Sequence, residues 1–174
     1  VRRGMPDLGT LVEFGPRLKW NLAEMPGGGR WFMELPLRGV FDLNDRGFHR
    51  GMSFEPRLTF QSRTQGEWFY STSAGAIFAD QRLASTLYGV ESRYSLAERT
   101  TSAAEAGLMA WRLSASASRK LSPDWRVFGF VRIDSVSGAA NQFSPLVKRN
   151  DGATMGLGVA YTWLRSSQTA SNAI

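Results

Sequence analysis

The chain of 174 residues contains no cysteine and only one histidine. The absence of cysteine excludes disulfide scaffolds, thiol nucleophiles and metal sites with cysteine ligands, and we expect no cofactor. Long hydrophobic runs are also missing, because no stretch approaches the roughly 18–20 apolar residues of a spanning helix. A helical membrane protein is therefore excluded. A membrane β-barrel is not excluded, because its alternating strands dilute every hydropathy window.

The amino end lacks the apolar core of a signal peptide, since Arg2 and Arg3 are followed by Met5-Pro6-Asp7. We therefore expect either that the mature chain begins at Val1 or that an upstream part is missing. The formal net charge is +6, which is typical of chains that bind nucleic acid or anionic lipid, or that have an arginine-rich interior. Nucleic-acid binding is disfavoured, because the basic residues alternate with apolar ones and form no contiguous helix face.

Alternation is clearest in the segment Gly152–Trp163. Every second residue from Ala153 is apolar, ending in Tyr161 and Trp163, while the residues between them are small or polar. Successive side chains of a strand point to opposite faces, and in a soluble sandwich the outer face usually carries charge. This strand is therefore expected to face lipid, and its end resembles the C-terminal signal read when outer-membrane barrels are assembled.

Six further segments alternate in the same way, at 11–22, 31–43, 52–63, 68–78, 109–120 and 125–134. Pro16, Pro36 and Pro56 fall inside them and predict bulges or breaks in the ladder. The connections alternate between short (23–30, 64–66, 122–124) and longer (44–50, 81–103, 136–151), and the segment from 81 to 103 lacks a clean period. Tight turns on one side and long loops on the other are typical of outer-membrane barrels.

The sequence therefore predicts an all-β fold, an antiparallel transmembrane β-barrel with seven strands visible. A last strand that ends in the periplasm requires an odd number of strands before the first one, so we expect ten to twelve in the complete barrel. Residues 1–174 are expected to form one domain that lacks its N-terminal strands and ends in a polar tail at 165–174.

Outward aromatic side chains are expected to form two belts at the membrane interfaces, because aromatic girdles mark both interfaces of a lipid-embedded barrel. The belt near the short turns comprises Trp20, Trp31, Trp68, Tyr70, Trp125, Tyr161 and Trp163, and the belt near the long loops comprises Phe14, Phe41, Phe54, Phe78 and Trp111.

Charged residues occupy the opposite face of the same strands and are expected to face the lumen. They are Glu13, Arg17, Lys19, Glu34, Arg38, Asp42, Glu55, Arg57, Arg63, Arg112, Arg126, Arg132 and Asp134. A salt-bridge network among them satisfies charges that cannot face hydrocarbon. The alternative is a narrow selective pore, although a barrel of roughly ten strands is too narrow for an open aqueous channel unless its interior is sparse.

Single residues suggest two other sites. His49 is the single histidine, and a lipid hydrolase would need it beside Ser53, together with Asp42 or Asp45. One histidine near serines is, however, expected by chance in a serine-rich chain. The loop cations could bind lipopolysaccharide phosphates by charge-assisted hydrogen bonds or could form a solvated surface. These cations are Arg82, Arg93, Arg99, Lys148 and Arg149.

Several segments resemble the MipA/OmpV outer-membrane family over about residues 8–164. They are Leu87-Tyr88-Gly89-Val90, Arg99, Ala106-Gly107, Leu121-Ser122-Pro123-Asp124-Trp125, Phe143-Ser144-Pro145-Leu146-Val147, Gly156 and Tyr161. The resemblance implies an outer-membrane barrel without catalytic residues, whose named member interacts with a lytic transglycosylase and helps to assemble peptidoglycan-remodelling enzymes. Other relatives are described as adhesins or antigens.

The resulting hypothesis is a bacterial outer-membrane scaffold and not an enzyme. Its expected partners are membrane lipid, lipopolysaccharide, a lytic transglycosylase and a peptidoglycan synthase, with the protein partners bound by the turns at 23–30, 64–66 and 122–124 and by the tail. The alternatives are a narrow transport pore for small solutes and an adhesin that acts through the long external loops.

Overall fold

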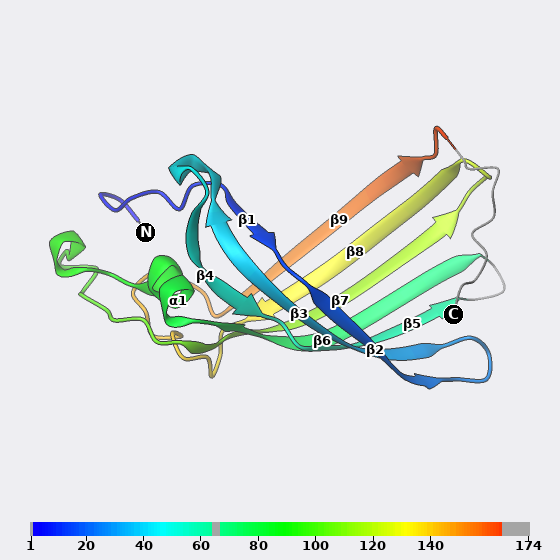
Figure 1. The fold of residues 1–174 in the computed structure, drawn as a ribbon, viewed down its shortest axis with the longest axis horizontal. Helices are drawn as coiled ribbons and strands as arrows, with labels where there is room; N and C mark the ends of the chain where they lie inside the picture. Colours follow the sequence, from blue (N-terminus) through cyan, green and yellow to red (C-terminus); the bar gives the residue numbers. More distant parts are fainter. Residues whose placement is uncertain (1, 64–66, 165–174) are drawn as a thin grey trace.

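The structure, a computed structural model, describes residues 2–63 and 67–164, without the side chain of Arg63. The predictions for the turn at 64–66 and for the tail at 165–174 lie outside the described residues. The described chain forms one antiparallel sheet and a single α-helix (Figure 1). The predicted all-β class is confirmed.

Nine strands make up the sheet, but they occupy seven positions across it. They are β1 (Leu11–Phe14), β2 (Arg17–Glu24), β3 (Arg30–Asp42), β4 (Phe48–Phe54), β5 (Arg57–Arg63), β6 (Trp68–Ala79), β7 (Gly107–Lys120), β8 (Trp125–Ser135) and β9 (Asp151–Tyr161). β1 and β2 both pair with β3, and β4 and β5 continue one another between β3 and β6. Each of the seven predicted segments therefore corresponds to one position in the sheet.

Prolines cause the two additional strand ends. Pro16 separates β1 from β2, and Pro56 separates β4 from β5, because proline cannot donate to the ladder. Their carbonyls still accept, from Leu37 and Ala76 respectively, so the sheet continues across both breaks. Pro36 lies inside β3, and its carbonyl accepts from Glu55, so the break expected there does not occur in β3.

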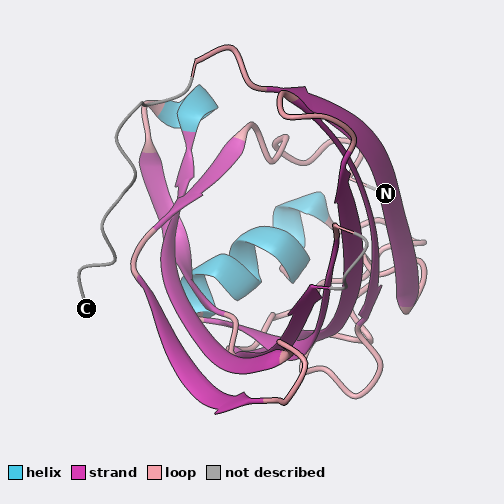
Figure 2. Ribbon diagram, turned by 90° about the vertical axis from the view of Figure 1, so that its right-hand side faces the viewer, coloured by secondary structure: helices cyan, strands magenta, loops and turns pink. Residues whose placement is uncertain are grey.

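The helix α1 (Gln81–Tyr88) lies inside the curve of the sheet (Figure 2). Its residues Leu83 and Ala84 form a small core with Val40 of β3, Ala79 of β6 and Met109 of β7. Val40 and Ala79 therefore point toward the inside of the curve. We call the face of the sheet that carries them the concave face. The opposite face is the convex face.

The connections sort by length between the two ends of the sheet (Figure 1). The connections after β2 and β7 are short and lie at one end, which we call the turn end. The opposite end, the loop end, carries the 3-10 helix η1 (Leu43–Asp45), α1, the 3-10 helix η2 (Ser92–Tyr94) and the long connection between β8 and β9. This is the predicted asymmetry.

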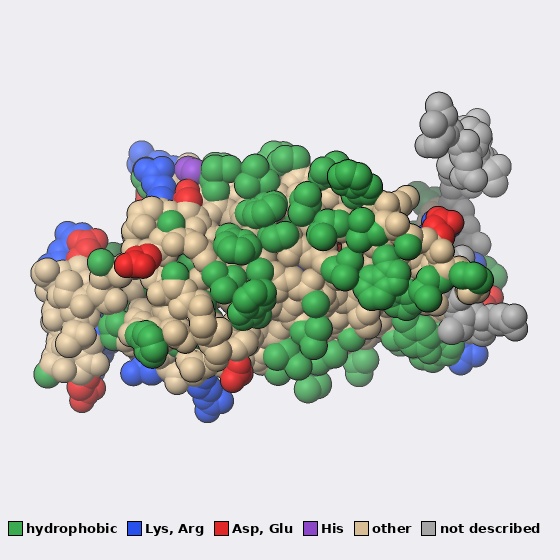
Figure 3. Space-filling view, turned by 90° about the horizontal axis from the view of Figure 1, so that it is seen from below, with side chains coloured by type: hydrophobic (Ala, Val, Ile, Leu, Met, Phe, Trp, Pro, Cys, Tyr) green, Lys and Arg blue, Asp and Glu red, His purple; other side chains and the backbone are tan. Residues whose placement is uncertain are grey.

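Apolar side chains cover the convex face in a broad band, with most charged groups beyond it toward the loop end (Figure 3). On β9, Met155 and Leu157 are 82% and 90% exposed. The alternation predicted for 109–120 places Met109 on the same outward face as Trp111, and the structure differs there. Met109 is the extra residue of a bulge between Leu108 and Ala110, so it points into the core and is 4% exposed. The expectation for Met109 is therefore wrong.

The sheet is curved but open within the described residues. Its two edges are β9 on one side and β1 with β2 on the other. Six successive antiparallel pairings separate β2 from β9, so these edge strands run in the same direction. The additional strands expected from the sequence stay a prediction.

Candidate functional site

A row of charged side chains crosses the middle of the concave face from β2 to β8. We call this row the ionic belt, and it comprises Arg17, Glu34, Glu55, Arg57, Arg112, Arg132 and Asp134. Strand alternation places all of them on one face, because paired residues in neighbouring strands point to the same side. The belt therefore joins charges that are far apart in the sequence.

Glu34 is the buried carboxylate of the belt on β3, with an exposed fraction of 6%. It accepts from Arg57 Nε at 2.8 Å and from Thr59 Oγ1 at 3.1 Å, and Arg17 Nη1 lies 3.4 Å from its other oxygen. These partners come from β2 and β5, on either side of β3. A buried charge is costly unless it is paired and hydrogen-bonded, and both conditions hold here.

Glu55 connects the two halves of the belt above Gly75 of β6. Its carboxylate accepts from Arg112 Nη1 at 3.1 Å and lies 3.6 Å from Arg57 Nη1. Gly75 is directly opposite both arginines, and a Cβ atom there would lie 2.6 Å from the Arg57 Cβ. The missing side chain therefore leaves the space that the belt crosses. The sequence analysis did not single out Gly75, although a glycine within an alternating strand signals such a close approach.

The belt ends on β8. Arg112 Nε donates to Asp134 at 2.7 Å, and Arg132 Nε lies 3.2 Å from the other oxygen of Asp134. The row thus alternates between bases and acids from Arg17 to Asp134 and ends on Arg132. The acids and bases of the row neutralise one another, and every carboxylate in the row has an arginine as its partner.

Three of the remaining predicted charges, Glu13, Arg38 and Asp42, lie apart from the belt toward the loop end and belong to two ion pairs. Arg38 donates to Glu13 at 2.9 Å, and Arg50 donates to Asp42 at 2.8 Å. Arg50 is a partner that the sequence analysis missed, because it is the extra residue of a bulge opposite Val40 and Phe41.

The last members of the predicted set lie toward the turn end. Lys19 places its Nζ 3.6 Å from the centre of the Phe32 ring, and Arg126 is exposed. The prediction for the side chain of Arg63 lies outside the described residues. That the concave face is a barrel lumen stays a prediction for every residue of the set.

A cavity of about 890 Å³ opens at the loop end, between residues 2–8, β4, α1 and residues 89–104. Arg2 lines it and donates to the carbonyls of Thr86 and Leu87 at the end of α1. Burial lowers the pKa of the Arg2 guanidinium, and nearby Arg99 lowers it further, while Asp7 opposes this shift. Arg2 therefore fixes the end of the helix against the amino-terminal segment.

The predicted loop cations have different surroundings. Arg82 lies 3.4 Å from His49 Nδ1, and Arg93 pairs with Glu91 at 2.9 Å. Arg99 is 5% exposed and donates to the carbonyls of Tyr94 and Arg3. Arg99 is therefore not available to an external phosphate, and we remove it from the set. The two other cations, Lys148 and Arg149, are exposed.

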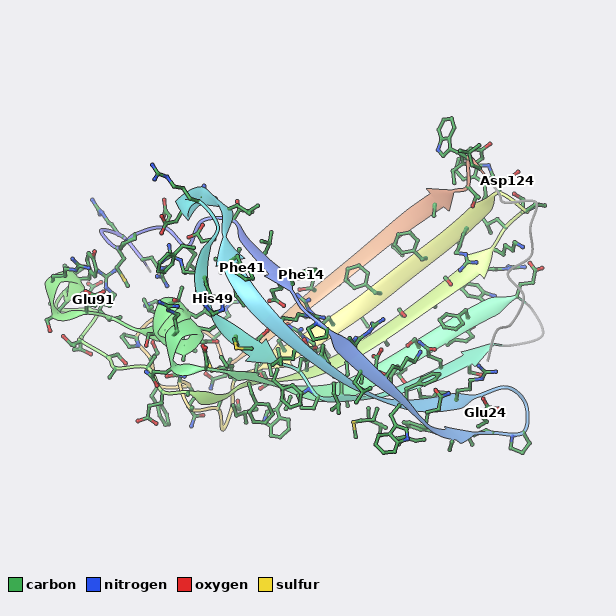
Figure 4. All side chains as sticks on the ribbon, viewed as in Figure 1. Phe14, Glu24, Phe41, His49, Glu91 and Asp124 are labelled. Atoms are coloured by element: carbon green, nitrogen blue, oxygen red, sulfur yellow. The ribbon has the colours of Figure 1, made fainter. Side chains whose placement is uncertain are left out.

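The hydrolase arrangement does not form among the described residues. The bulge at Arg50 places His49 opposite Phe41 on the convex face, whereas Ser53 is opposite Arg38 on the concave face. His49 instead contacts the Phe41 ring, with 5.2 Å between the ring centres (Figure 4).

Aromatic side chains gather at both ends of the strands. At the turn end, rings contact in the pairs Trp31–Phe60, Trp68–Tyr70, Trp125–Tyr161 and Tyr161–Trp163. Toward the loop end, Phe54 contacts Phe78 and Phe41 contacts His49. Phe14, Trp20 and Trp111 are exposed on the strands. The contact of these rings with lipid stays a prediction.

Two kinds of feature are absent from the described residues. No group of three or more histidine, aspartate or glutamate side chains is arranged to hold a metal ion in the part of the chain that the structure describes. Within the same residues, no helix has the length and apolar character needed to cross a membrane.

Two of the segments that carry the sequence resemblance, 87–90 and 143–147, meet at the loop end. Ser144 Oγ donates to the Tyr88 carbonyl at 2.7 Å, and the adjacent Val90 is 2% exposed. No curated protein and no solved structure matches the chain. The family model described as MltA-interacting protein MipA matches residues 1–163. The chain therefore belongs to the MipA family.

Proposed function

We propose that this chain is a bacterial outer-membrane barrel protein that acts as a binding scaffold for peptidoglycan-remodelling enzymes. The observation that carries the proposal is the family match, because the family name describes interaction with MltA, a peptidoglycan-remodelling enzyme. The family is a binding family and not a known enzyme family. The proposed protein partners are a lytic transglycosylase and a peptidoglycan synthase.

The distribution of side chains supports a membrane location. The convex face is apolar along β9, whereas the acids and arginines of the ionic belt lie on the concave face. Lipid offers no partner for charge or for free backbone groups, so a spanning sheet must hide its charges inside. We propose that the convex face contacts the acyl chains and that the aromatic pairs lie near the two interfaces.

The same interior disfavours an open transport pore. The helix α1 occupies the curve of the sheet near the loop end (Figure 2), and the ionic belt crosses the concave face below it. Two layers of packed or paired side chains therefore lie along the axis that a solute would follow.

We place the enzyme-binding surface at the turn end, which faces the periplasm in this orientation. The test is capture of a purified lytic transglycosylase by the full chain in detergent micelles. We expect capture to fail when the turns at 25–29 and 121–124 are both replaced by Gly-Ser linkers of equal length. A matched control replaces residues 145–150 at the loop end. Capture that survives the turn replacements, or that fails equally in the control, would contradict the assignment.

A second binding role is proposed for the loop end. Arg82, Arg93, Lys148 and Arg149 would contact lipopolysaccharide phosphates, an idea supported by the exposure of Lys148 and Arg149. Binding to vesicles with and without lipopolysaccharide tests it, and K148Q/R149Q should weaken the difference between them. An adhesin role of these loops rests on the same exposed surface.

A further inference from the structure

The turn-end half of the concave face differs from the ionic belt because it carries basic groups without matching acids. Lys19 of β2, Lys120 of β7 and Arg126 of β8 are exposed on this half. On the turn-end side of the belt, the described strands carry one acidic residue, Glu24. It pairs with Arg30 at 3.2 Å. The strand residues of this half therefore carry a net positive charge.

Lys120 and Arg126 form the clearest unbalanced contact. They are directly opposite one another in the ladder between β7 and β8, and like charges in such a pair destabilise a sheet. No ion pair joins either of them to a carboxylate in the described part of the chain. An anion bound between them would remove the repulsion.

Two phenylalanines add an apolar surface beside these charges. Phe128 and Phe130 lie on the concave face of β8 and are 41% and 45% exposed. Their rings lie over Gly158 and Gly156 of β9, since a Cβ atom at Gly156 would lie 2.6 Å from the Phe130 ring. Each ring therefore covers the backbone of β9 on one side and keeps a substantial part of its surface accessible.

Hydroxyl groups line the neighbouring strands. Ser71 and Ser73 of β6 lie level with Ser116 and Ser114 of β7, and Ser116 is directly opposite Phe130. Alternation places these serines on the concave face, where they can donate to and accept from a polar ligand.

We propose that the turn-end half of the concave face binds an anionic oligosaccharide, namely a carboxylated glycan fragment of peptidoglycan. Sugar rings present C–H groups that pack on the Phe128 and Phe130 rings and hydroxyls that pair with the serines. Carboxylates of N-acetylmuramic acid form charge-assisted hydrogen bonds with Lys120 and Arg126. The inference rests on the proposed function, because that function places this face in contact with the periplasm.

An acidic peptide is the other ligand that a basic surface attracts. The observations favour the glycan, because exposed rings beside many hydroxyls fit a ligand that is apolar on its ring faces and polar at its edges. The two ligands are therefore tested side by side.

The experiment uses the full chain in detergent micelles and isothermal titration calorimetry. The probes are a peptide-free peptidoglycan tetrasaccharide, chitotetraose as its neutral counterpart, and hexaglutamate. We expect the acidic tetrasaccharide to bind at least about tenfold more tightly than chitotetraose. K120Q/R126Q should remove this preference. The matched control is R119Q, because Arg119 is adjacent in the sequence but lies on the convex face beside Trp68.

Folding of each variant is checked by its heat-modifiable migration on gels. Equal binding of the two tetrasaccharides, loss of binding in R119Q, or binding of hexaglutamate alone would each overturn the proposal. The double variant F128L/F130L should bind both tetrasaccharides more weakly than the unchanged chain. An unchanged affinity would also contradict the proposal. Capture of the transglycosylase is measured separately. Failure of the glycan site can therefore be distinguished from failure of the scaffold proposal.

Discussion

At the scale of single residues, Gly75 is decisive because the ionic belt passes over it. We expect Gly75→Val to push Arg57 and Glu55 apart and to lower the free energy of unfolding by about 1–3 kcal/mol. The effect is measured by heat-modifiable migration, as the temperature at which the band of the folded protein is lost from the gel. Gly152→Val is the control, because nothing lies within 4 Å of a Cβ atom at that position of β9. Equal effects of the two changes would contradict the role of Gly75.

Glu34 provides a second prediction at this scale. Glu34→Gln should destabilise the fold by about 3–5 kcal/mol, because it leaves Arg57 in a buried belt without its nearest carboxylate. Glu13→Gln should cost at most about 1 kcal/mol, because its pair with Arg38 is more exposed. Urea titration of both variants in micelles compares them. A similar midpoint for the two would show that burial does not determine how much each ion pair contributes to the free energy of unfolding.

At the scale of elements, α1 depends on its amino-terminal cap. The Asp80 carboxylate accepts from the Leu83 backbone N–H at 2.8 Å. Asp80→Ala should weaken the helix by about 0.5–2 kcal/mol and increase hydrogen exchange between residues 81 and 104. Glu91→Ala is the comparison, because Glu91 precedes η2 without a capping bond from its side chain. Unchanged exchange in Asp80→Ala would mean that packing alone holds α1.

Sequence reasoning missed α1 because its apolar residues are few. The available signals were Asp80, an N-cap residue just before the segment from 81 to 103, and the leucine pair Leu83 and Leu87 at helical spacing within it. Helix formation in so short a segment depends mainly on tertiary packing, here against Val40 and Met109. The sequence alone does not contain those contacts.

At the scale of the whole molecule, the two faces should respond differently to charge. Leu157→Arg places a charge on the apolar convex face and should reduce folding into lipid vesicles, with a cost of about 2–4 kcal/mol if it lies near the bilayer centre. Ser116→Arg, on the concave face, should fold normally. The folded fraction is measured by heat-modifiable migration, and equal folding of the two variants would contradict a lipid-facing convex side.

The seven strand positions, their faces and the division into short and long connections were predictable from the sequence. Strand alternation has a period of two residues and is therefore a local property, which even Pro16 and Pro56 do not disrupt. The charged and apolar faces follow from the same period.

Only the tertiary structure decided which charges pair and which residues leave their expected face. A bulge adds one residue and reverses the alternation, so Met109 entered the core and His49 separated from Ser53. The belt joins Glu55 to Arg112 across 57 positions in the chain, over the space left by Gly75. Such contacts depend on strand register and curvature, which local periodicity does not encode.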